Sequence, residues 1–161
     1  MSTIPARADV LNYVSGHLAT VFDTMLTLKV APAATCDPGR FVGGRVSGTV
    51  GLAGEVVTGS FCLHISAPFA TQITAAMLGM APEEITGTAE TNDVVCEVTN
   101  MLGGGLKSWL CDAGAACVLS TPAVIRGESF SITGNHNVEQ LVVPFECGAE
   151  HGVVEVRLKY A

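Results

Sequence analysis

The chain has 161 residues, and 15 Asp and Glu against 8 Lys and Arg give it a formal net charge of −7 at pH 7. No five-residue window gathers Lys or Arg, so the chain lacks the basic patch that binding to nucleic-acid phosphates requires. No apolar run reaches the roughly 20 residues of a membrane span, and the first 18 residues do not have the pattern of a signal peptide. We therefore expect a cytoplasmic protein with no nucleic-acid partner and no membrane partner.

Three stretches with regular apolar spacing are expected to be helices. Between residues 5 and 26, apolar residues recur every three or four positions, which predicts an amphipathic helix. A second helix is expected to begin at Ser66, whose hydroxyl can cap it, and to end at Gly79. The third begins between residues 88 and 92 and runs to about Asp112, which makes it the longest helix of the chain.

Alternating apolar residues predict the strands. Residues 46–50 and 55–65 are separated by a short Gly-containing turn and are expected to pair as a β-hairpin. Pro144 indicates an edge or a bulge in a later strand. Strands are expected after the third helix at residues 116–119, 121–125, 129–133, 138–147 and 153–160, with a turn at 134–137.

This order of elements predicts an α+β fold in a single domain that covers residues 1–161. The antiparallel sheet is expected to consist of the N-terminal hairpin and a C-terminal meander, with the three main helices packed on one face. A chain of this length can bury roughly 68–70% of its unfolded surface, so it needs no disulfide or metal to fold.

The cysteines and histidines do not predict a metal site. The six cysteines have no Cys-x-x-Cys spacing, and the four histidines have no i, i+4 pair and no Cys-x-x-His pair. We therefore interpret the cysteines as small buried apolar residues and expect no bound metal. No Gly-x-Ser-x-Gly sequence occurs, so nucleophilic catalysis by a serine is the least favoured enzyme class.

The outward side of the third helix carries the most informative residues. At 100° per residue, the polar positions Asp93, Asn100 and Lys107, together with Gly104, fall within about 80° of Glu97. Apolar residues fill the opposite side. Residues 103–105 are three consecutive glycines in mid-helix, at a cost of roughly 1 kcal/mol each relative to Ala. We infer that a strand of the core or a partner approaches the backbone there.

Spacing alone favours a plain interpretation, in which Glu97 and Asn100 are solvated residues on an amphipathic helix. A wider pattern favours a site. Asp93, Glu97 and Asn100, followed 22 positions later by Pro122, resemble the signature of the CheC/CheX/FliY chemotaxis phosphatases. The order of elements also agrees along essentially the whole chain. Residues 10–26 look like the first helix of the CheX branch, whose members carry one Glu-x-x-Asn element.

The resemblance implies a phosphatase that hydrolyses the aspartyl phosphate of a CheY-like response-regulator receiver domain. It implies that Glu97 pairs with the active-site lysine of the receiver and that Asn100 holds the attacking water. Asp93 and Gly104 would flank the contact, and Lys107 could tune docking. The chain itself would bind no cofactor, because Mg²⁺ is expected on the receiver.

One alternative to the phosphatase remains open at this stage. A CheX-like binding module could dock on a receiver or on a flagellar-switch protein without hydrolysing anything. The resemblance also implies a homodimer formed by continuous sheet pairing, for which residues 141–147 and 152–160 are long enough to offer an edge.

Overall fold

A computed structural model describes residues 4–34, 41, 43–128, 130–133 and 137–161. Its elements confirm the expected α+β class: three α-helices, one short 3₁₀ helix and a seven-stranded sheet within the described residues. In chain order they are α1 (Arg7–Leu26), β1 (Ala31–Pro32), β2 (Arg45–Ala53), β3 (Val57–Ser66), α2 (Ala67–Leu78), η1 (Pro82–Glu84), α3 (Thr88–Asp112), β4 (Val118–Leu119), β5 (Ala123–Gly127), β6 (Glu139–Cys147) and β7 (Glu150–Tyr160).

The sheet is antiparallel throughout, in the order β1-β6-β7-β3-β2-β4, and β5 also pairs with β2. The predicted hairpin is confirmed, with Arg45 opposite Ser66 at one end of the β2–β3 pairing and Ala53 opposite Thr58 at the other. The strands after α3 do not form a continuous meander. β4 and β5 pair with β2, whereas β6 and β7 form a hairpin on the other side of β3.

Burial explains this arrangement. β7 is buried along most of its length, so it belongs between β3 and β6, while the short β5 is largely exposed and pairs at the β2 side. The predicted strand at 129–133 is also wrong for its described residues 130–133, which form no strand. The carbonyls of Phe130 and Ile132 accept hydrogen bonds from the side chains of Arg45 and Arg157. Of the predicted turn at 134–137, residues 134–136 lie outside the described residues.

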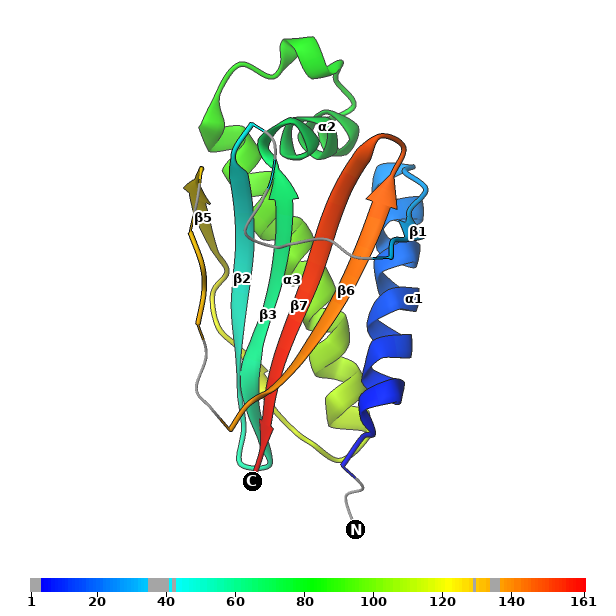
Figure 1. The fold of residues 1–161 in the computed structure, drawn as a ribbon, viewed down its shortest axis with the longest axis vertical. Helices are drawn as coiled ribbons and strands as arrows, with labels where there is room; N and C mark the ends of the chain where they lie inside the picture. The colour runs from blue at the N-terminus through cyan, green and yellow to red at the C-terminus, as the bar shows by residue number, and fades with distance from the viewer. Residues whose placement is uncertain (1–3, 35–40, 42, 129, 134–136) are drawn as a thin grey trace.

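The three helices cover one face of the sheet. In Figure 1, α1 and α3 run along the far side of the sheet in opposite directions, and α2 lies across one end. Three phenylalanine rings join the layers, because Phe22 of α1, Phe69 of α2 and Phe145 of β6 lie with their centroids 5.6 to 6.2 Å apart. All three side chains are fully buried, so they mark the centre of the core on the helix side.

The ends of α2 follow the chemistry that the sequence predicts. The Ser66 hydroxyl accepts a hydrogen bond from the Phe69 amide at 3.1 Å, and Gly79 ends the helix with φ of 66°. No helix in the described part of the chain is both long and apolar enough to cross a membrane.

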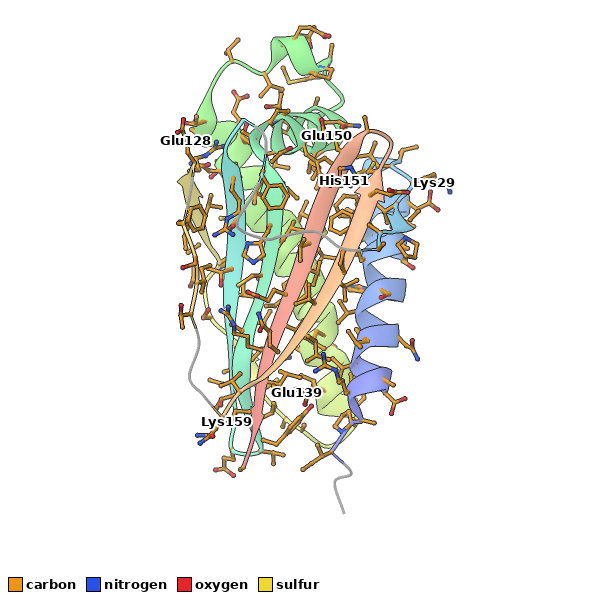
Figure 2. All side chains as sticks on the ribbon, viewed as in Figure 1. Lys29, Glu128, Glu139, Glu150, His151 and Lys159 are labelled. Atoms are coloured by element: carbon orange, nitrogen blue, oxygen red, sulfur yellow. The ribbon has the colours of Figure 1, made fainter. Side chains whose placement is uncertain are left out.

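The other face of the sheet is polar and yet largely buried. Ser47, His64 and Glu155 project from β2, β3 and β7 on this side, and each is at most 3% exposed. In contrast, three polar residues labelled in Figure 2 lie toward the ends of the strands, with Glu150 and His151 at the β6–β7 turn and Lys159 at the opposite end. The middle of this face therefore forms a second, polar interior.

Candidate functional site

Helix α3 is the scaffold of the candidate site, and the sheet fixes its position. Its inner side is buried at nine positions, including Val95, Thr99 and Leu106. Gly48 of β2 lies directly beneath the helix, since a Cβ atom at this position would overlap the Thr99 hydroxyl. The absence of a side chain at Gly48 lets α3 approach the sheet closely, so the helix is held rigidly.

The three consecutive glycines have three different surroundings. A Cβ at Gly103 would come within 2.6 Å of the Val50 side chain of β2, and one at Gly105 would overlap the His17 ring of α1. A Cβ at Gly104 would meet only Leu119, at an ordinary 3.7 Å. Both a core strand and a neighbouring helix therefore approach this backbone, while Gly104 points away from them.

Glu97 and Asn100 lie on the outer side of α3, as the sequence predicts. Glu97 is exposed and Asn100 is half-buried, and their separation of three positions corresponds to about 4.5 Å along the helix axis. Within the described part of the chain, neither side chain is hydrogen-bonded or ion-paired. Both are therefore free to bind a partner.

The other three predicted contact residues lie on the same strip of α3. Asp93 is exposed, whereas Gly104 and Lys107 are half-buried. Pro122 lies in the connection between β4 and β5, and both of these strands contact α3. The structure therefore brings Asp93, Gly104 and Lys107 onto the surface that carries Glu97 and Asn100.

Structure on both sides of this strip holds the helix. On one side, Asn92 accepts a hydrogen bond from Arg126 of β5 at 2.5 Å. On the other side, His17 donates to the backbone carbonyl of Met101 at 3.2 Å, and the Tyr13 ring stacks between His17 and Trp109. The half-buried Trp109 packs against the core, as predicted from its place on the apolar side. The Asn92–Arg126 bond has no signal in the sequence, because it joins residues that are 34 positions apart.

The candidate site is an open helix surface. A pocket of about 790 Å³ does lie between the start of α1 and the end of α3, but its lining includes Asp9, Tyr13, Trp109 and Asp112 and neither Glu97 nor Asn100. An exposed carboxylate and a half-buried carboxamide on the outer side of a packed helix suit contact with another macromolecule.

Metal-binding donors are found elsewhere in the described residues. The metal-ligating side chains that converge most closely there are Cys62, His64 and Glu155, on the face of the sheet opposite the helices. Burial raises the pKa of the Cys62 thiol. Burial alone would also raise the pKa of Glu155, but hydrogen bonds from His64 and Gln140 and the charge of Arg157 bring it below its ordinary value. Glu155 is therefore a stable buried carboxylate.

Comparison with known proteins identifies relatives of this fold. The family model described as "Chemotaxis phosphatase CheX" matches residues 46–146, which is more than half of the chain. A comparison with curated proteins finds no match. The chemotaxis protein CheX from Vibrio vulnificus is 28% identical, with a TM-score of 0.79, over 97% of this chain and all of that one.

Two further solved structures agree. A CheC-like superfamily protein from a Shewanella species is 28% identical, with a TM-score of 0.80, over 96% of this chain and 99% of that one. The CheX of a CheX–CheY–BeF₃–Mg²⁺ complex from Borrelia burgdorferi shares the fold, at 24% identity and a TM-score of 0.73 over 95% of this chain and 99% of that one. With the family model spanning α3 and most of the sheet, these matches show that the chain belongs to the CheX family of chemotaxis phosphatases.

Proposed function

We propose that this chain hydrolyses the aspartyl phosphate of a CheY-like receiver domain. One observation carries the proposal: Glu97 and Asn100 lie one turn apart on the outer side of α3, without partners in the described chain. The B. burgdorferi relative is described as a complex of CheX with CheY, BeF₃ and Mg²⁺. We assign the same kind of partner to this chain.

Asn100 is the proposed water-positioning residue. A carboxamide can accept a hydrogen bond from the attacking water through its oxygen and donate to a phosphoryl oxygen through its nitrogen. A carboxylate at the same place would repel the phosphoryl anion. An acyl phosphate on a receiver already has Mg²⁺ and a lysine beside it, so the main task of a helper protein is to hold water in line with the P–O bond.

Glu97 is the proposed anchor for the receiver lysine. Glu97 is exposed on α3, so a lysine can form a charge-assisted hydrogen bond with it. This bond would fix the position of Asn100, one turn away, relative to the receiver. Asp93, Gly104 and Lys107 would contact the receiver around this pair. No metal is needed on the chain for this reaction, because the Mg²⁺ belongs to the receiver.

The chain is also proposed to form a homodimer through a sheet edge. Of the two predicted edges, residues 152–160 offer none, because they belong to β7, which lies inside the sheet between β3 and β6. β6 is more accessible, since among the described residues its outer side pairs with β1 at Phe145 and Glu146 and accepts one further hydrogen bond, from Ala33 to the Pro144 carbonyl. A monodisperse monomer by light scattering at micromolar concentration would contradict this part of the proposal.

The test is phosphate release from Mg²⁺-loaded response regulators of the same source, charged with acetyl phosphate. Wild type should accelerate the decay, and Asn100→Ala should lower the rate by about 100-fold or more while the affinity for the regulator is retained. Glu97→Ala should weaken docking. Asn12→Ala removes an exposed carboxamide from α1 and serves as the matched control, with unchanged rates.

The alternative is a docking module without catalysis. It would bind a receiver or a flagellar-switch protein through the same strip of α3 and leave phosphate release unchanged. Measurable binding to a charged regulator, with no acceleration by wild type, would therefore select this alternative and reject the phosphatase.

A further inference from the structure

A buried cluster on the face of the sheet opposite α3 has the composition of a metal site. We propose that Cys62, His64 and Glu155 bind a divalent ion of the zinc class. Cys62 and His64 lie two residues apart on β3 and so share one face, and Glu155 is opposite Cys62 on β7. The three potential donor atoms all lie within 4.8 Å of one another. Thiolate, imidazole and carboxylate are the ligands that Zn²⁺ takes in proteins.

The distance between two of these atoms is long for a hydrogen bond and also suits two ligands of one ion. The Nε2 atom of His64 and the Oε1 atom of Glu155 are 3.4 Å apart. A charge-assisted hydrogen bond between such groups is shorter, at about 2.7–2.9 Å. Two ligands of a tetrahedral zinc ion with bonds of about 2.0–2.1 Å are separated by roughly 3.3–3.4 Å. The observed separation therefore matches the edge of a zinc coordination tetrahedron.

Each proposed ligand has an outer hydrogen-bond partner that fixes its orientation. The Ser47 hydroxyl lies 2.7 Å from Nδ1 of His64, which leaves Nε2 facing the cluster. Gln140 donates to Oε2 of Glu155 and Arg157 donates to Oε1. The Sγ atom of Cys62 lies 3.3 Å from the Thr49 hydroxyl, which can donate to a thiolate. Such second contacts are characteristic of metal ligands and tune their affinity.

The surroundings shield the cluster from water. Cys62, His64 and Glu155 are each at most 3% exposed. Residues 130–133 are tied to this face at two points, because Arg45 donates to the Phe130 carbonyl and Arg157 donates to the Ile132 carbonyl. A thiolate and a carboxylate supply two negative charges against the two positive charges of the ion, while the Arg157 guanidinium adds one positive charge beside Glu155. With three protein ligands, a four-coordinate ion keeps one position for water.

A bound ion would join β3 to β7 in the middle of the sheet. Because it binds the folded chain, it would also stabilise that state by mass action. Figure 1 views the sheet from this side, with α3 behind it, so the cluster is separate from the strip that carries Glu97 and Asn100. The metal site and the proposed phosphatase activity can therefore be tested independently.

The experiment uses the full chain, treated with a chelator at neutral pH and then titrated with Co²⁺ as the spectroscopic probe. Wild type should bind one equivalent, with a near-ultraviolet thiolate-to-cobalt charge-transfer band and visible bands of a tetrahedral ion. Zn²⁺ should abolish these bands by competition and raise the melting temperature. Cys62→Ser should lose the charge-transfer band, and His64→Gln should weaken Co²⁺ binding about tenfold or more.

The control is Cys117→Ser, which changes another buried cysteine and should behave as wild type, because Cys117 directly precedes β4, at the other end of the sheet order from β6 and β7. Circular dichroism of each variant shows that it is folded. The proposal is overturned if wild type shows no charge-transfer band at millimolar Co²⁺, or if Cys62→Ser keeps the band. Since the first criterion uses wild type alone, a variant that fails to fold does not prevent a decision.

Discussion

On its inner side, α3 packs against β2, β3 and α1 so closely that Gly103 and Gly105 have no space for a side chain. On its outer side, Glu97 and Asn100 contact no other side chain by hydrogen bond or ion pair within the described residues. The free energy of folding therefore depends on one side of the helix, and the proposed activity depends on the other. This separation lets a rigid helix present reactive groups without using them for stability.

The largest expected effect is the loss of a core side chain from the inner side. Leu106 is fully buried, so Leu106→Ala should lower the free energy of unfolding by about 2–5 kcal/mol through lost burial and a cavity. Chemical denaturation measures this change. Lys107→Ala, at the next position on the outer strip, is the matched control and should change stability by less than about 0.5 kcal/mol. Equal effects at both positions would refute the assignment of the two sides.

A smaller effect is expected where α1 and α3 touch. A Cβ at Gly105 would displace the His17 ring, which stacks on Tyr13 and bonds to the Met101 carbonyl. Gly105→Ala should destabilise by about 1–2 kcal/mol, because overpacking outweighs the better helix propensity of Ala.

A double-mutant cycle sharpens this prediction. In the His17→Ala background the obstacle is gone, so Gly105→Ala should become neutral or stabilising. The coupling energy between the two positions is then about 1–3 kcal/mol. Additive effects of the two substitutions would contradict the proposed contact.

Local patterns predicted much of this structure. The spacing of apolar residues predicted the long helix α3 and its outward strip. Ser66 caps the start of α2 and Gly79 caps its end, as expected. The hairpin of β2 and β3 followed from alternation and a short turn. In each case the deciding pattern is local, whether it is apolar spacing, a helix cap or a short turn, so the sequence contains it directly.

Long-range pairing could not be predicted in the same way. Alternation in residues 129–133 suggested a strand, but nothing local shows that the carbonyls of Phe130 and Ile132 accept hydrogen bonds from arginines of β2 and β7. The convergence of His64 with Glu155, 91 positions apart, depends on β7 pairing with β3 rather than on spacing. The three glycines likewise differ only through their neighbours Val50, Leu119 and His17.

Gly104 should respond differently from the glycine next to it. A Cβ there meets Leu119 at 3.7 Å, so Gly104→Ala should be neutral or should stabilise the helix by up to about 1 kcal/mol. If a receiver approaches the Gly104 backbone, the same substitution should weaken binding to the regulator. Thermal unfolding and a binding titration on the same sample separate the two effects. Unchanged affinity would remove Gly104 from the contact surface.

The smallest expected effect on stability belongs to the residues with the largest expected effect on activity. Because Glu97 and Asn100 make no hydrogen bond or ion pair through their side chains in the described chain, Glu97→Ala and Asn100→Ala should each change the free energy of unfolding by less than about 0.5 kcal/mol. Denaturant titration of both variants beside wild type measures this. A loss above about 1.5 kcal/mol would mean that the outer side also supports the fold, and any loss of phosphatase rate would then have a structural cause. Unchanged stability with lost turnover would instead assign the effect to the reaction itself.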